Sequence, residues 1–91
     1  MTCEQFHRVT RALADPQRFA LLERLTGARE VPCQELVEAF PVTQATISHH
    51  LKVLRDVRFI FSERRGTFMY YRVNHDCVAA FPEAARQILG A

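Results

Sequence analysis

The stretch Thr43-Gln44-Ala45-Thr46-Ile47-Ser48-His49-His50-Leu51-Lys52-Val53-Leu54-Arg55 decides the fold. Ile47, Leu51 and Leu54 recur at i, i+4 and i+7, which predicts a helix with one apolar face. The remaining surface is rich in short hydrogen-bonding side chains and carries no carboxylate, and the first acid, Asp56, stands at the far end. A solvent-facing helix more often mixes Glu with Lys, because i,i+4 ion pairs stabilise it. We therefore interpret this stretch as a recognition helix whose side chains touch base edges and phosphates in a DNA major groove.

Two helices are predicted at the start of the chain. The first covers residues 3–14. The second begins at Pro16, with Asp15 as its N-cap and Gly27 as a left-handed terminator. Their predicted apolar faces consist of Phe6, Val9 and Leu13 in the first helix, and of Phe19, Leu22 and Leu25 in the second.

A third short helix is predicted to begin near Pro32 and to end at Pro41. Only two residues then separate it from Thr43, the candidate N-cap of the recognition helix. Two short helices joined by a turn of this length form a helix-turn-helix unit.

A β-hairpin is predicted directly after the recognition helix. Residues 59–63 and 67–73 are rich in aromatic and β-branched side chains and flank Arg64-Arg65-Gly66, whose glycine supplies the turn. A final helix is predicted over residues 76–89, with Pro82 expected to kink or delay it. The sequence thus predicts a mainly α fold with a β-hairpin wing, a winged helix-turn-helix in the order α-α-α-α-β-β-α.

Length and composition indicate a small single-domain protein, and its charge is distributed unevenly along the chain. Ninety-one residues make a single domain, residues 1–91, and 48% apolar residues are enough for a core. The net charge is only +2, but residues 43–72 carry six basic and two acidic side chains. A basic centre is the footprint of a phosphate-binding face, although an excess of this size also arises by chance on a solvated surface. With no membrane-spanning run and no signal-peptide pattern, we expect a cytoplasmic protein that does not contact a membrane.

Three blocks of sequence stand in a familiar order: residues 12–18 (ALADPQR), 43–55 (TQATISHHLKVLR) and 65–73 (RGTFMYYRV). Together they resemble the ArsR/SmtB family of bacterial repressors. The resemblance implies a homodimeric transcriptional repressor that binds a palindromic double-stranded DNA operator and leaves it when an effector binds. It also implies that residues 1–14 and 74–91 form the dimerisation helices.

Two departures from the family pattern concern the wing and the effector. Arg58 stands near the place of a helix-ending glycine, and because a left-handed non-glycine residue costs roughly 1 kcal/mol, we expect it to continue the helix or to contact DNA. The family's Cys-x-Cys metal pair corresponds to Pro32-Cys33-Gln34, in which neither expected position is cysteine. The family's other zinc site, on the last helix, lacks a second histidine after His75. We therefore expect no cofactor, and an effector other than a metal bound by Cys-x-Cys.

The three cysteines are expected to be reduced thiols, and no Cys/His pair is identified as having structural zinc spacing. The ordinary role of such a thiol is that of a small buried hydrophobe, as expected for Cys77. In some relatives an N-terminal arm brings a thiol to the third helix of the other subunit. Cys3 and Cys33 are accordingly a candidate effector site for a soft ion such as As(III), or for a regulatory disulfide.

The candidate DNA-binding residues are Thr43, Gln44, Ala45, Thr46, Ser48, His49 and Lys52 on the recognition helix, and Arg64, Arg65 and Thr67 on the wing. The alternative is that the helix residues only cap and solvate a helix start and that the cations stay in water. His49 and His50 diverge by about 100° on a helix, which argues against joint metal binding. His50 falls beside the apolar face and is predicted to be packed, whereas His49 points to the polar face.

Two functions from other classes stay open at this point. One is a winged-helix protein-interaction module that does not bind DNA directly. The other is a small enzyme that uses His49 or His50 with a cysteine nucleophile. The sequence shows no arrangement of base, nucleophile and orienting group, so we do not expect an enzyme.

Overall fold

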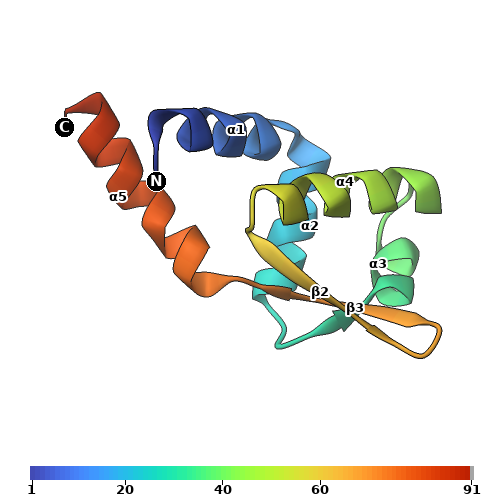
Figure 1. The fold of residues 1–91 in the computed structure, drawn as a ribbon. Helices are drawn as coiled ribbons and strands as arrows, with labels where there is room; N and C mark the ends of the chain where they lie inside the picture. The colour runs from blue at the N-terminus through green and yellow to red at the C-terminus, as the bar shows by residue number, and fades with distance from the viewer. Residues whose placement is uncertain (91) are drawn as a thin grey trace.

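The computed structural model describes residues 1–90, which form a winged helix-turn-helix (Figure 1). Residue 91, the last of the predicted dimerisation segment 74–91, lies outside the described residues. Helices α1 and α5 lie together at one end of the molecule, and the β2–β3 hairpin extends from the other end (Figure 1). The elements are, in order, α1 (Cys3–Ala14), α2 (Pro16–Thr26), β1 (Val31–Pro32), α3 (Cys33–Ala39), α4 (Gln44–Asp56), β2 (Ile60–Arg65), β3 (Phe68–Val73) and α5 (His75–Leu89).

The start of α2 is fixed as predicted, but its end is not. One carboxylate oxygen of Asp15 accepts hydrogen bonds from the backbone N–H groups of Gln17 at 2.9 Å and Arg18 at 3.0 Å. The Arg18 N–H stabilises the charged form and lowers the pKa of Asp15. Gly27, by contrast, is right-handed at φ −79°, so the predicted left-handed terminator is wrong. The N–H of Ala28 instead bonds to the carbonyl of Leu25 at 3.2 Å, so the helix ends in a tighter, 3₁₀-type turn.

The core forms beneath α4, as its apolar face predicts. Ile47, Leu51 and Leu54 are each at most 1% exposed. The predicted face of α2 requires a correction, because Phe19 is 43% exposed while its neighbour Leu21 is fully buried. Helix α2 packs against both α4 and β3. The side that it buries therefore includes Leu21, whereas spacing alone had placed Phe19 there.

The sheet has one strand more than the sequence predicts. The two-residue strand β1 pairs antiparallel with β3, with Val31 opposite Tyr71, in the sheet order β1-β3-β2. Such a short strand has no periodicity of its own, and its pairing depends on a segment 40 residues away. The predicted hairpin tip also shifts, because Arg64 and Arg65 belong to β2 and the turn consists of Gly66 and Thr67. Gly66 supplies the left-handed conformation there, at φ 62°.

The junction between α4 and β2 is closed by a left-handed arginine. Arg58 has φ 65°, so the expectation that it continues the helix is wrong. Its N–H bonds to the carbonyl of Arg55 at 2.9 Å, and the N–H of Phe59 bonds to the carbonyl of Leu54 at 3.0 Å. These two bonds form a Schellman motif, which is usually built around glycine. Asn74 holds the motif from outside by donating its side-chain amide to the carbonyl of Arg58 at 2.9 Å.

Asn74 also caps α5, through a hydrogen bond from the N–H of Cys77 to its side-chain oxygen at 3.3 Å. Helix α5 consequently begins at His75, and Pro82 lies within it without delaying it. Among residues 1–90, none of the helices is long and apolar enough to cross a membrane.

Replacing Arg58 with glycine is expected to stabilise the protein by about 1 kcal/mol, because glycine adopts the left-handed conformation without a steric penalty. Urea denaturation of Arg58→Gly and Arg58→Ala measures this effect. The alanine variant also loses the guanidinium but keeps its Cβ, so no comparable gain is expected from it. Equal free energies of unfolding for the two variants would contradict this account of the junction.

Candidate nucleic-acid interface

Helix α4 presents a polar face to solvent on the side opposite its buried residues. Gln44, Ser48 and His49 are exposed, and their side chains make no hydrogen bond within the described part of the chain. Ala45 and Lys52 are exposed on the same surface. The face therefore offers free amide, hydroxyl and imidazole groups to a partner, which are the groups that read base edges.

The two threonines at the start of α4 have a structural role. The Thr43 hydroxyl accepts a hydrogen bond from the N–H of Thr46 at 3.2 Å, which confirms Thr43 as the N-cap. The two hydroxyls also lie 3.0 Å apart, within hydrogen-bond distance. A DNA contact by either threonine stays a prediction.

His50 anchors α4 to the junction between α1 and α2. It is only 6% exposed, which confirms the predicted packed histidine. Its Nε2 donates to the side-chain oxygen of Gln17 at 2.9 Å, and its Nδ1 lies 3.3 Å from a guanidinium nitrogen of Arg18. A guanidinium can only donate, so Nδ1 must accept and the ring is neutral. Burial lowers the pKa of His50, against the opposing effect of the Asp15 charge.

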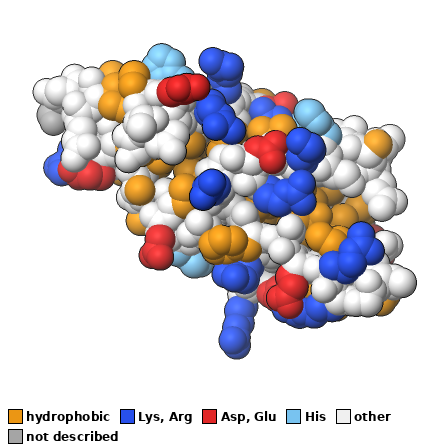
Figure 2. Space-filling view, in the orientation of Figure 1, with side chains coloured by type: hydrophobic (Ala, Val, Ile, Leu, Met, Phe, Trp, Pro, Cys, Tyr) orange, Lys and Arg blue, Asp and Glu red, His pale blue; other side chains and the backbone are white. Residues whose placement is uncertain are grey.

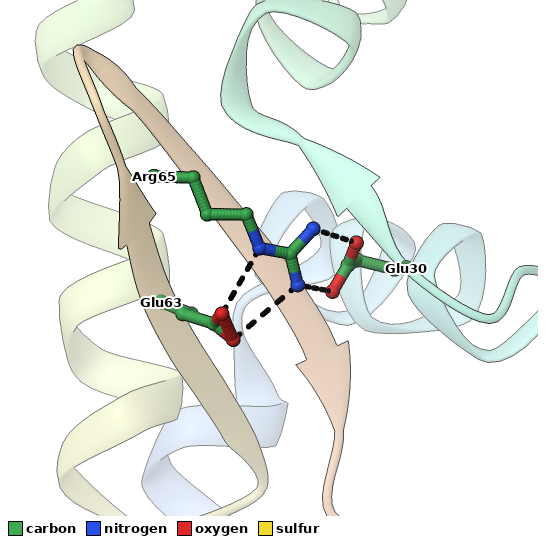
Figure 3. Close-up of polar contacts among 3 residues, drawn as sticks. All are labelled: Glu30, Glu63 and Arg65. Atoms are coloured by element: carbon green, nitrogen blue, oxygen red, sulfur yellow. Dashed lines mark hydrogen bonds and ion pairs between the residues drawn. The ribbon is translucent and has the colours of Figure 1, made fainter.

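The hairpin is held in place by an ion-pair network (Figure 3). Arg65 donates both terminal nitrogens to the carboxylate of Glu30, one of them at 2.6 Å, and donates its Nε to Glu63 at 2.9 Å. The same guanidinium lies 4.5 Å from the centre of the Tyr70 ring. These hydrogen bonds lower the pKa of Glu30 and raise that of Arg65. The guanidinium of Arg65 thus ties β2 to the segment before β1, a role that sequence reasoning did not identify.

Arg64 is exposed on the wing and makes no ion pair within residues 1–90. The turn residue Thr67 and its neighbour Phe68 are exposed as well. A groove of about 290 Å³ separates this part of the hairpin from α3 and α4, with Gln44 and Ser48 on the α4 side. The wing and the polar face of α4 therefore border one shared groove.

The two candidate effector thiols lie at different places on the chain. Cys33 is half-buried at the start of α3 and lines the groove between α4 and the hairpin, where burial raises the pKa of its thiol. Cys3 is exposed on α1, with its Sγ 3.7 Å from Nε2 of His7. This contact between Cys3 and His7 was not predicted from the sequence, although their i,i+4 spacing on a helix indicates it. Within residues 1–90, no three His, Cys, Asp or Glu side chains gather as a metal site would require.

Comparison with known proteins places this architecture in a family. The model of a helix-turn-helix domain family matches residues 13–60. The arsenical resistance operon repressor of Bacillus subtilis (strain 168) is 35% identical over 72 residues, which cover 79% of this chain and 69% of that protein. The transcriptional repressor SdpR of the same organism is 34% identical over 68 residues, which cover 75% and 74%. The chain belongs to the ArsR family.

Solved structures of ArsR-family proteins share the fold. An ArsR-like transcriptional regulator from Rhodococcus sp. RHA1 superposes with a TM-score of 0.84 over 96% of this chain and 81% of that one, at 23% identity. The homodimeric winged helix-turn-helix DNA-binding domain Mb0332 from Mycobacterium bovis gives a TM-score of 0.76 at 28% identity, over 96% and 79%. The predicted fold class is thereby confirmed, and this chain is an ArsR-family winged helix-turn-helix transcriptional regulator.

The buried neutral His50 is expected to make folding depend on pH. The unfolded chain takes up a proton near pH 6.5, whereas the folded state resists it because the pKa of His50 is lowered. The stability that depends on a neutral His50 is therefore fully present well above pH 6.5 and falls as the pH drops below it, by at most about 1.4 kcal/mol per pH unit. Urea denaturation between pH 7.5 and 5.5 measures the slope.

His50→Gln is expected to flatten this dependence. His49→Gln, which removes the exposed neighbouring imidazole, serves as the matched control and is expected to keep the wild-type slope. A slope that survives in His50→Gln would show that another group is responsible.

Proposed function

We propose that this ArsR-family regulator is a transcriptional repressor that binds a palindromic double-stranded DNA operator. Helix α4 enters the major groove, and the hairpin contacts the adjacent backbone or minor groove. The single observation that carries this proposal is the free polar face of α4, fixed above a buried core and bordered by the hairpin. The repressors among its relatives support the same reading.

The residues of the proposed interface fall into groups with different roles. Gln44 and Ser48 read base edges, because amide and hydroxyl groups match the donors and acceptors of the major groove. Lys52 and Arg64 bind phosphates, which positions the protein without selecting a sequence. Arg65 acts by orienting the hairpin through Glu30, and Ala45, His49 and Thr67 supply further contacts on the same surface.

We propose a homodimer as the DNA-binding form. The homodimeric relative Mb0332 supports this assembly, as do the apolar side chains that α5 leaves at the surface, among them Ile88 and Leu89. Helices α1 and α5 supply the interface, and the two copies of α4 lie about 34 Å apart, one turn of DNA.

The effector is proposed to act without a Cys-x-Cys metal pair. The thiols of Cys3 and Cys33 are the candidates, for a soft ion such as As(III) or for an oxidant. An adduct on Cys33 would occupy the groove beside Gln44 and Ser48 and so compete with DNA. Arsenite or hydrogen peroxide is therefore expected to release DNA from the wild type, and equal release from Cys33→Ser would remove Cys33 from the proposal.

In vitro selection from random-sequence duplexes tests DNA binding directly and provides a site for the variants. Recovery of an inverted repeat supports the repressor. A chain that binds no duplex, or whose affinity is insensitive to salt, favours instead a winged-helix module for protein partners, because each phosphate contact releases a counterion.

Gln44→Ala is expected to reduce discrimination between the selected duplex and one mutated in a half-site by about 1–3 kcal/mol, since a base contact is lost. Arg64→Ala is expected to weaken binding to both duplexes alike and to lower the salt slope by about 1. Fluorescence anisotropy at several salt concentrations measures both quantities. Intact discrimination in Gln44→Ala would contradict base reading by α4.

A further inference from the structure

Three arginines border a hollow beside the C-terminal half of α4. The hollow has a volume of about 210 Å³. Its residues, which we call the arginine hollow, are Arg8, Arg11, Ala12, Arg18, Val53, Asp56 and Val57. We propose that the arginine hollow binds a DNA backbone phosphate on the side of α4 opposite the wing. This inference rests on the proposed DNA-binding function and extends the interface to α1.

Two arginines of α1, Arg8 and Arg11, line this hollow. Arg8 and Arg11 are three residues apart and therefore share one face of the helix, while Val9 and Ala12 are buried on another. Both arginines are exposed, and neither makes an ion pair within residues 1–90. Two free guanidinium groups beside a recognition helix are available to a phosphate.

The third arginine is held rigidly at the base of the hollow. Nε of Arg18 donates to the carbonyl of Ala12 at 2.6 Å, and its terminal nitrogens donate to the carbonyl of Arg11 at 3.3 Å and to His50. All these partners are uncharged, so the positive charge of Arg18 is not neutralised by an ion pair. Because the same guanidinium reaches His50 of α4, the hollow keeps a fixed position relative to the recognition helix.

The one carboxylate in the hollow is already paired. Asp56 accepts a hydrogen bond from Nζ of Lys52 at 3.1 Å, and both side chains are solvent-exposed. An exposed pair of this kind is weak and exchanges readily, so it leaves Lys52 able to turn to a phosphate. The hollow therefore keeps an excess of positive charge.

The arginine hollow adjoins Lys52, a cation on the exposed face of α4, through the Asp56 side chain that both share. Figure 2 shows Lys and Arg side chains along one face, from the region of α1 across α4 towards the hairpin. The charges counted along the sequence do not predict a basic site on α1, because residues 1–42 are slightly acidic as a whole. Folding places two α1 arginines against Val53 and Asp56, more than 40 residues away in sequence.

A phosphate is the ligand that this chemistry favours. Guanidinium groups bind phosphate through paired N–H donors. A helix in the major groove lies between two phosphate backbones, and half or more of protein–DNA hydrogen bonds go to backbone groups. The hairpin lies beside one flank of α4, and the arginine hollow lies beside the other.

The test compares the double variant Arg8→Gln/Arg11→Gln with wild type on a 30-bp duplex obtained by selection. Each lost phosphate contact lowers the slope of log K against log salt by about 0.9. The double variant is expected to lose up to about 0.9 units of slope, the equivalent of one phosphate contact, and to bind about tenfold more weakly at 150 mM salt, with unchanged discrimination between sequences. Arg24→Gln, an exposed arginine of α2 that lines none of the hollows around α4, is the matched control and is expected to keep the wild-type slope.

The outcomes separate this inference from the proposed function. If the wild type binds and the double variant keeps its slope, the arginine hollow does not contact DNA, although α4 still does. If the wild type binds no duplex, the proposed function itself fails. Inorganic phosphate at matched ionic strength is expected to displace DNA no better than chloride. Stronger displacement by phosphate that is lost in the double variant would show a site for a free anion and overturn the proposal.

Discussion

Burial of one face of α4 is the constraint on which the rest of the molecule depends. Ile47, Leu51 and Leu54 lie in the core, where each contributes about 1.5–3 kcal/mol by leaving water. Rotating α4 about its axis would expose these side chains and bury polar ones without partners. His50 adds a directional restraint through its bonds to Gln17 and Arg18. The opposite face of α4 is therefore held outward in one orientation, as recognition of a rigid duplex requires.

Electrostatics divides the cations of this protein into two classes. Arg65 forms ion pairs with two carboxylates and orients the hairpin, so its charge is already neutralised within the protein. Arg8, Arg11 and Arg64 make no ion pair among the described residues; the first two line the hollow beside α4, and Arg64 belongs to the hairpin. A phosphate-binding surface is thus better recognised from unpaired cations placed by the fold than from the number of arginines in a segment.

Local signals in the sequence predicted the helices, the caps at Asp15 and Thr43 and the hairpin, because each of these features depends on neighbouring residues. Strand β1 was missed because it exists only through pairing with β3. Arg58 was misassigned because the local cost of its left-handed backbone is offset by Asn74 and by the buried Phe59, which are contacts of the folded state. The pairing of Arg65 with Glu30, 35 residues away, and the hollow beside α1 could not be predicted for the same reason.

The most direct test of the central claim is methylation protection of guanine N7, an atom exposed in the major groove. With α4 in that groove on both half-sites of a selected duplex, dimethyl sulfate is expected to spare guanines in two segments about one helical turn apart. Unprotected guanines throughout a duplex that the protein binds tightly would show that the exposed face of α4 does not enter the groove.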